Sequence, residues 1–168
     1  MYCKGGVNQY TRDLTGQVVI VTGGTAGIGK ETARELARRG ATVLVTGRDQ
    51  DKGRRVVEEV RKEGAKGEVK FFKVDFKDLG EVKRFAVGFK KEYGRLDILI
   101  NNAGATFSNL KRSEKGVEET MLVNHLAPTY LTYLLIPTIE RTPQSRIINV
   151  SSRAHEKPVK DVQHEQTF

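Results

Sequence analysis

The chain has 168 residues, of which 38% are hydrophobic and 30% charged, a composition typical of one globular domain. No apolar run is long enough to span a bilayer, and Cys3, the only cysteine, cannot pair within the chain, so we expect no membrane span and an intracellular, reducing compartment. The net charge of +8 favours anionic partners in general, but acids and bases are mixed, as in residues 52–59, and no aromatic side chains interrupt a basic stripe, so we expect no nucleic-acid partner.

Short apolar runs alternate with amphipathic stretches along most of the chain. Residues 1–15 lack periodicity and are expected to form an N-terminal arm. Apolar, β-branched runs predict buried strands, and an apolar stripe every three or four residues predicts a helix. Strands are expected at residues 17–22, 41–46, 69–74, 96–100 and 145–151, and helices at about 27–39, 50–63, 79–93 and 117–139.

Two of these elements have further features. Asp78 and Glu81 form a plausible capping pair for the third helix. The fourth helix is apolar nearly all round, which predicts burial. Residues 105–113 are expected to be a loop, and residues 152–168 an irregular C-terminal segment.

The alternation of strands and helices predicts an α/β fold, with right-handed crossovers that place helices on both faces of a parallel sheet. We expect a Rossmann-type, doubly wound, three-layer α/β/α domain over residues 16–151, with strand order 3-2-1-4-5. Such a sheet binds its ligand where the strand order reverses, which here lies between the first and fourth strands.

A glycine cluster lies between the first strand and the first helix. Glycines allow a sharp turn and the close approach of a ligand, and the amides and positive dipole end of the helix favour a pyrophosphate. The spacing differs from the G-x-G-x-x-G dinucleotide pattern, and a tight turn without a ligand is the alternative. The cluster is Thr22-Gly23-Gly24-Thr25-Ala26-Gly27-Ile28-Gly29.

Three motifs in order resemble the short-chain dehydrogenase/reductase family. They are the glycine cluster, Asn101-Asn102-Ala103-Gly104 after the fourth strand, and Asn149-Val150-Ser151-Ser152 at the end of the fifth. The stretches 29–33, 123–126 and 151–155 are most similar to the retinol-dehydrogenase-like branch. The resemblance covers residues 14–155 and implies an oxidoreductase that binds a nicotinamide dinucleotide.

The resemblance also implies roles for individual residues. The diphosphate would lie on the glycine turn, and Asp75 would meet the adenine amino group, although a turn residue is the alternative there. Asn102, Ala103 and Gly104 would border the adenosine ribose and steady the sheet. The turn residues assigned to the cofactor are Gly23, Thr25, Gly27, Ile28 and Gly29.

Cofactor choice depends on the residues after the second strand. NAD sites usually place an acid there for the ribose 2′-hydroxyl. Here Gly47 and Arg48 occupy that place, and a guanidinium pairs well with a 2′-phosphate, so we expect NADP(H) to be favoured over NAD(H), with Lys30 adding charge. Asp49, one place later, is the counter-argument, and a plain surface role is the alternative for Arg48.

The family's catalytic asparagine and serine correspond to Asn124 and Ser152, and no metal site is expected. A structural role inside a helix bundle is the alternative for Asn124. Pro128 lacks the N–H that would bond the Asn124 carbonyl in an α-helix, so we expect a bend near Asn124 and a freed carbonyl, which in the family holds a water. A kink that only fits the helix to its neighbours is the alternative.

The family's Tyr-x-x-x-Lys has no counterpart, since none of the five tyrosines has a lysine four places later. Loss of a general acid slows a reaction by roughly a hundredfold to ten-thousandfold, so we expect catalysis by these residues alone to be slowed by at least that factor. The resemblance implies that the C-terminal part of the fold is missing. Apolar surface on the fourth and fifth strands and the long helix is therefore expected to be exposed, or covered by a protein partner, a continuation or a rearranged edge.

Two functional hypotheses remain open at this point. The first is an oxidoreductase acting on an alcohol or carbonyl substrate, completed by the missing tyrosine and lysine segment. The alternative is a non-catalytic Rossmann subunit with a structural or nucleotide-sensing role in a larger complex. An RNA-binding domain is the weakest interpretation, because it rests on net charge alone.

Overall fold

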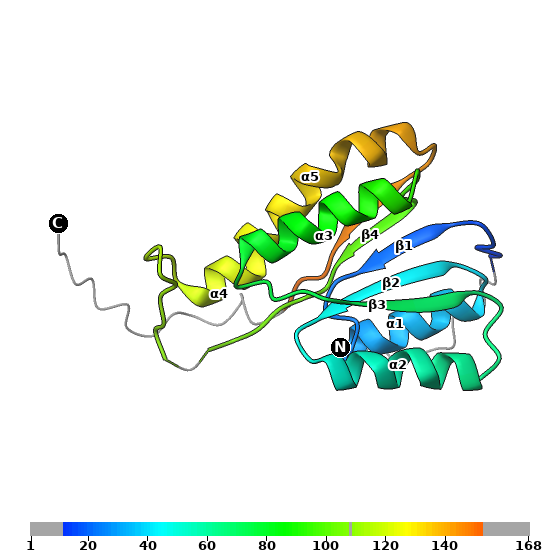
Figure 1. Cartoon of the computed structure of the whole chain (residues 1–168), viewed down its shortest axis with the longest axis horizontal. Helices are drawn as coiled ribbons and strands as arrows, with labels where there is room; N and C mark the ends of the chain where they lie inside the picture. The colour runs from blue at the N-terminus through cyan, green and yellow to red at the C-terminus, as the bar shows by residue number, and fades with distance from the viewer. Residues whose placement is uncertain (1–11, 108, 153–168) are drawn as a thin grey trace, which may run out of the picture.

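A computed structural model describes residues 12–107 and 109–152 as a parallel, five-stranded sheet (Figure 1). Its strand order is β3-β2-β1-β4-β5, which confirms the order expected from the sequence. The first strand of the chain lies in the middle of the sheet, and the order reverses between β1 and β4. The strands are β1 (Val18–Val21), β2 (Thr42–Gly47), β3 (Glu68–Lys73), β4 (Ile98–Asn101) and β5 (Arg146–Asn149).

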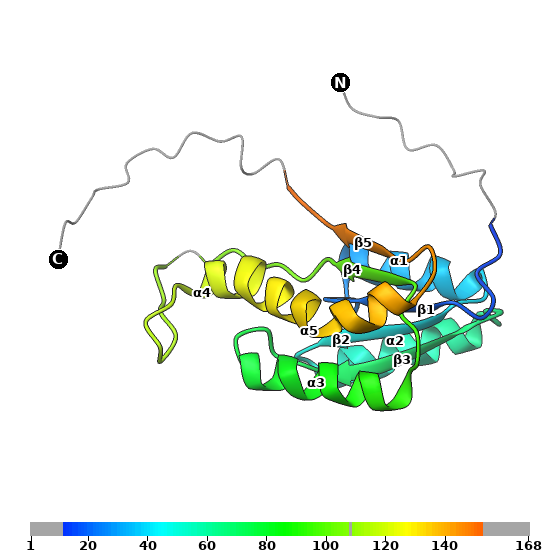
Figure 2. The same ribbon diagram turned by 90° about the horizontal axis from the view of Figure 1, so that it is seen from above.

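Helices cover both faces of the sheet, as Figures 1 and 2 show. One face carries α1 (Gly27–Arg38) and α2 (Gln50–Lys62). The other carries α3 (Leu79–Glu92) and a long helix composed of α4 (Glu119–Met121), a π-helical turn η1 (Leu122–Leu126) and α5 (Ala127–Arg141). The predicted three-layer, doubly wound architecture is confirmed. No helix in the described part of the chain is long and apolar enough to cross a membrane.

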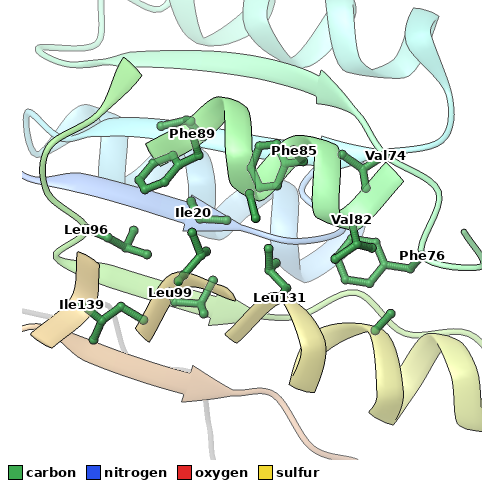
Figure 3. Close-up of a cluster of buried hydrophobic side chains, with 14 of the residues drawn as sticks. Ile20, Val74, Phe76, Val82, Phe85, Phe89, Leu96, Leu99, Leu131 and Ile139 are labelled. Atoms are coloured by element: carbon green, nitrogen blue, oxygen red, sulfur yellow. The ribbon is translucent and has the colours of Figure 1, made fainter. Parts of the chain in front are cut away.

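Alternation along the strands divides the core into two layers. Ile20, Leu44 and Leu99 belong to the layer that faces α3 and α5. Figure 3 shows Ile20 and Leu99 together with Phe85 and Leu131 in this layer. The intervening strand residues face α1 and α2. Because a central parallel strand is buried on both sides, its sequence is a continuous apolar run, as in β1. The second layer includes Val19, Val21, Val43, Val45, Ala33, Ala37, Val56 and Val60.

The amino end of the sheet is fixed by one buried acid. The Asp97 Oδ2 accepts a hydrogen bond from the backbone N–H of Val18 at 2.8 Å, and the Arg95 guanidinium binds the same carboxylate. Backbone hydrogen bonds also join Asp97 to the carbonyl of Val18 and to the N–H of Arg146. Asp97 thereby sets the register of β1, β4 and β5 at one point.

The capping pair of α3 differs from the expected one. Asp78 is the N-cap and accepts from the N–H of Gly80 at 2.7 Å. Glu81 reaches past it and accepts from the N–H of Asp75 at 2.7 Å instead. The pair therefore fixes the turn between β3 and α3, which places Asp75 at the carboxyl edge of the sheet.

The predicted burial of the long helix is only partly correct. Its inner face is buried at residues such as Leu131 and Leu135, but Tyr133 is 69% exposed and Ile136 is partly exposed. On β5, Ile147 is 42% and Ile148 43% exposed, whereas β4 is almost fully covered. The expected apolar exposure is thus confirmed for β5 and α5 and wrong for β4. The reason is that β5 is the edge strand, so nothing in the described ranges lies beyond it.

The start of the described chain also packs against the domain. Leu14 is buried, and its N–H donates to the carbonyl of Arg39 at 2.8 Å. Asp13 pairs with Lys66, so the final residues of the expected arm contribute to the fold. Residues 1–11, with Cys3, and residues 153–168 lie outside the described ranges.

Candidate functional site

The glycine turn packs tightly against the end of β4. Gly23 has a φ of +65°, and a Cβ placed there would lie 2.9 Å from the Cα of Ala103. Gly29, in the first turn of α1, is buried, and a Cβ there would lie 2.4 Å from the Asn102 Nδ2. Side chains at these two positions would separate the turn from the strand, which explains why glycine is required at both.

A polar lock holds the switch point between β1 and β4. The Thr22 Oγ1 accepts from the backbone N–H of Asn102 at 3.0 Å and of Ala103 at 2.9 Å. In return, the Asn102 Nδ2 donates to the carbonyls of Thr22 at 2.9 Å and Gly23 at 3.2 Å. Asn102 therefore holds the glycine turn against the sheet with its side chain, which agrees with the expected role in steadying the sheet.

The amino end of α1 has no side-chain cap. Its N-cap is Ala26, no acid lies in its first turn, and nothing lies within 4 Å of the Cβ direction of Gly27. By contrast, carboxylates of Asp49 and Asp78 cap α2 and α3. The first amides of a helix need a partner, and at α1 an anion such as a diphosphate fits that need.

A cavity of about 280 Å³ opens beside this turn at the carboxyl edge of the sheet. Asp75 reaches it from the end of β3, and its Oδ1 also accepts from the N–H of Lys77 at 2.9 Å. Asp75 therefore faces the cavity and stabilises a turn at the same time. The predicted cofactor residues that line this cavity are Gly23, Thr25, Arg48, Asp75, Ala103 and Gly104.

Gly47 stands at the end of β2, where an NAD-type site usually has an acid. A Cβ at Gly47 would lie 2.8 Å from the Thr25 Cγ2, so a side chain there would require the Thr25 side chain to move. Asp49 is engaged as the cap of α2, where backbone hydrogen bonds, chiefly from Lys52, lower the pKa of its carboxyl. Arg48 is exposed at the cavity. The expected contribution of Lys30 stays a prediction, and its Nζ lies 2.6 Å from the Glu59 carboxylate of α2.

A larger cleft of about 1280 Å³ continues from this cavity, and the two share Ala103, Gly104 and Ala105. Asn124 and Ser152 both line it, so the two predicted catalytic residues are brought to one cleft by different elements. Ile28 and Asn102 also lie on its wall, on the side of the glycine turn. The structure therefore joins the dinucleotide turn to the expected catalytic residues along a continuous surface.

The side chain of Asn124 clamps the loop after β4. Its Oδ1 accepts from the N–H of Ala105 at 2.8 Å, and its Nδ2 donates to the carbonyl of Ala105 at 2.8 Å. Asn124 is exposed to the cleft, which argues against a buried role inside a helix bundle.

The helix departs from α geometry at Asn124 through a π-helical turn, while the expected bend and freed Asn124 carbonyl stay predictions. Residues 122–126 form a π-helical turn, and the N–H of Ala127 bonds to the carbonyl of Leu122, five residues earlier. Pro128 follows directly and has no N–H to offer to the Asn124 carbonyl. A π-turn is a recognised way to insert a residue into a helix, and here it coincides with the residue assigned to the cleft.

Comparisons with known proteins agree with this geometry. The family model described as short chain dehydrogenase matches residues 17–164. The chain belongs to the short-chain dehydrogenase family. Within it, the chain is similar to the retinol-dehydrogenase-like branch: it is 41% identical to human retinol dehydrogenase 12 over 99% of this chain and 54% of that protein. It is 43% identical to human retinol dehydrogenase 11 over 90% of this chain and 48% of that protein.

Solved structures of the same family have the same architecture. A metagenomic short-chain oxidoreductase in complex with NADP superposes with a TM-score of 0.77 at 35% identity, covering 88% of this chain and 67% of that one. A 7α-hydroxysteroid dehydrogenase complexed with NADH gives 0.73 at 29% identity, covering 88% and 57%. The chain spans about half the length of the curated relatives it matches.

Within the described part of this chain, a tyrosine and a lysine meet away from the cleft. The Lys70 Nζ and the Tyr93 hydroxyl are 3.0 Å apart, between β3 and the end of α3. Burial raises the pKa of Tyr93, which is the opposite of what an activated proton donor needs. This pair is structural and does not replace the family's Tyr-x-x-x-Lys.

The sequence reasoning missed a polar cluster in the wall of the cleft. The Asn101 Nδ2 donates to the Thr132 Oγ1 at 3.1 Å and to the Asn149 Oδ1 at 2.9 Å, which links β4, β5 and α5. Asn101 and Asn149 are the last residues of their strands and stand opposite each other. An asparagine at the end of each apolar run was the available signal, but only strand register shows that the two meet.

Proposed function

We propose that this chain is the dinucleotide-binding part of an NADP(H)-dependent oxidoreductase that acts on an alcohol or carbonyl substrate. The uncapped amino end of α1 carries the proposal, because it faces open space beside a cavity that Arg48 lines. A dinucleotide places a diphosphate and an adenosine ribose in that arrangement. The family membership supports the oxidoreductase over a non-catalytic subunit.

The residues present fit such a ligand. The first amides of α1, at Gly27, Ile28 and Gly29, would hold the diphosphate. Asp75 would accept a hydrogen bond from the adenine amino group, and Arg48 would pair with the 2′-phosphate. When bound, the dinucleotide supplies or accepts the hydride.

At the cleft, the residues of this chain bind and orient. Ser152 would donate a hydrogen bond to the substrate oxygen, and Asn124 holds the loop that borders the ribose through Ala105. The sequence assigns no tyrosine or lysine to the proton-transfer step. The role proposed for these residues is therefore to bind and orient the cofactor and the substrate. The proton would come from a tyrosine equivalent to that of the family's Tyr-x-x-x-Lys.

The lining of the cleft favours a lipophilic substrate. Ile28 is 71% exposed in its wall, and Ile136, Ile147 and Val150 are partly exposed there as well. Apolar walls with a few polar groups bind apolar ligands and orient them. The names of the retinol dehydrogenases among the relatives agree with this chemistry.

A carboxylate placed at the N-cap of α1 tests the dinucleotide site. Ala26 has an extended φ of −157°, which an N-cap aspartate adopts without strain. Ala26→Asp is expected to raise the free energy of unfolding by about 1 kcal/mol by capping the helix. The same change should weaken NADPH binding at least tenfold, because the carboxylate takes the amides and repels the diphosphate.

Ala26→Asn is the matched control, since it caps the helix without the charge. Calorimetric titration measures the affinity for NADPH, and urea unfolding measures the free energy of unfolding. We expect the asparagine variant to lose much less affinity than the aspartate variant at equal stability. Wild-type protein that binds no NADPH, or an aspartate variant that binds it as tightly as the wild type, would contradict the proposal.

A further inference from the structure

We infer that Lys73 is a second cation for the 2′-phosphate of the dinucleotide, acting together with Arg48. The inference rests on the proposed NADP(H) function and deepens it by naming a residue that determines cofactor choice. Neither the sequence motifs nor the lining of the adenosine cavity points to Lys73. Its place in the sheet does.

Strand register puts Lys73 beside the cofactor end of β2. Parallel pairing sets Lys73 opposite Gly47. Two residues earlier on each strand, and therefore on the same face of the sheet, Phe71 stands opposite Val45. Val45 and Phe71 pack in the layer beneath α1 and α2. Since side chains alternate between faces, the Cβ of Lys73 lies on the α2 side of the sheet, while the residue, on an edge strand, also borders a small hollow beside Arg84 and Phe85 of α3.

The packing of α2 fixes how far along the helix Lys73 lies. A Cβ at Gly53 would fall 2.3 Å from the ring of Phe71, so Gly53 sits directly over that ring. From Phe71 to Lys73 the strand advances about 6.6 Å, and from Gly53 back to Asp49 the helix spans about 6 Å. As α2 begins at the end of the sheet where β2 and β3 finish (Figure 1), Lys73 lies level with Asp49.

The charges around this point leave several cations available, among them Arg48, Lys73 and Arg55, whose charge also helps to lower the pKa of Asp49. Asp49 is held by the amides of Asp51 and Lys52 at 3.0 Å, and a Lys52 Nζ stands 3.8 Å from it. In the described ranges, neither Arg48 nor Lys73 has an ion-pair partner, and both are exposed. By contrast, Lys30 on α1 is already paired with an acid of α2.

Two cations match the charge of the ligand group better than one. A phosphate monoester carries close to two negative charges near pH 7, and charge-assisted hydrogen bonds from a guanidinium neutralise about half of that. A lysine that reaches the same phosphate supplies the remainder. The uncharged 2′-hydroxyl of NADH would not be stabilised by a lysine in this way. Lys73 should therefore raise the affinity for NADPH and leave that for NADH unchanged.

The competing interpretation gives Lys73 no ligand at all. It stands on β3, which is an edge strand, and edge lysines discourage the pairing of strands between molecules. That role predicts a change in aggregation and no change in the ratio of NADPH to NADH affinity. The ratio therefore separates the two interpretations.

The test is calorimetric titration of the full chain with NADPH and NADH, and with 2′,5′-ADP and 5′-AMP as probes of the adenosine end alone. Lys73→Gln should weaken binding of NADPH and 2′,5′-ADP by about twofold to fivefold, the range for one exposed charge contact. Binding of NADH and 5′-AMP should stay unchanged. Lys73→Arg should retain the affinity for the 2′-phosphate.

Lys83→Gln is the matched control, because it removes the same charge from α3 on the opposite face of the sheet. The inference would be overturned if Lys73→Gln and Lys83→Gln had the same effect on the ratio of NADPH to NADH affinity. If Arg48→Gln still abolished the preference for NADPH in that case, the proposed function would stand. Wild-type protein that binds no NADPH would overturn both.

Discussion

Replacing Gly29 by alanine is expected to lower the free energy of unfolding by about 3 kcal/mol. The added Cβ would lie 2.4 Å from the Asn102 Nδ2 and 2.5 Å from the Gly23 carbonyl oxygen, both closer than atoms tolerate. Forcing a methyl group into packed surroundings costs about 2 kcal/mol. Displacing Asn102 would also break its hydrogen bonds to the carbonyls of Thr22 and Gly23, at about 1 kcal/mol each.

One term opposes this loss. Gly29 lies in a helix, where alanine is favoured by about 1 kcal/mol, so the three terms leave a net loss of about 3 kcal/mol. Urea unfolding followed by circular dichroism measures it. Gly88→Ala in α3 is the control, since nothing lies within 4 Å of that position, and it should stabilise the protein by about 0.5 to 1 kcal/mol. Equal effects of the two substitutions would refute the argument that Gly29 is required by the approach of Asn102.

Three further substitutions test the lock, the buried acid and the tyrosine. Thr22→Val keeps the shape but leaves two amides without the Oγ1 acceptor, and should cost about 2 kcal/mol in urea unfolding; a loss under about 0.5 kcal/mol would contradict the lock. Asp97→Ala leaves the buried N–H of Val18 unpaired and should cost about 2 to 3 kcal/mol, a value that unfolding in high salt should not erase. Burial raises the pKa of Tyr93, so the unfolded chain releases that proton first, near pH 10.0, and stability should fall as the pH rises from there through the higher folded pKa. Tyr93→Phe should flatten that alkaline decline in unfolding midpoints measured from neutral pH upward, whereas Tyr133→Phe, at an exposed site, should not.

The sequence predicted the fold in most respects because its signals are local and repeated. Each apolar run became a strand, and each stripe of apolar residues became a helix that covers one face of the sheet. The strand order was expected from the doubly wound arrangement that alternating strands and helices favour. The elements themselves are local, so spacing and composition predict them, whereas the pairings that realise the order join residues far apart in the chain, such as Val19 and Ile98.

What the sequence failed to indicate has a common cause. The long helix was expected to be buried all round, yet Tyr133 is exposed. The apolar content of a segment indicates how much surface it could bury. It does not indicate whether another helix or strand covers that surface. Lys30 was expected to add charge at the cofactor site, which stays a prediction, but the sequence did not indicate its ion pair with Glu59 of α2. In both cases the deciding contact comes from an element far away in the sequence.

By itself, the sequence determined the strands, the helices and the presence of a glycine turn at the head of a helix, because backbone conformation and the burial of apolar runs are set largely by neighbours along the chain. Only the tertiary structure decided that a side chain at Gly47 would meet Thr25, that Asn124 clamps Ala105, and that Lys73 lies level with the start of α2. Those facts depend on register and packing between strands and helices, where a shift of one residue moves a side chain to the opposite face.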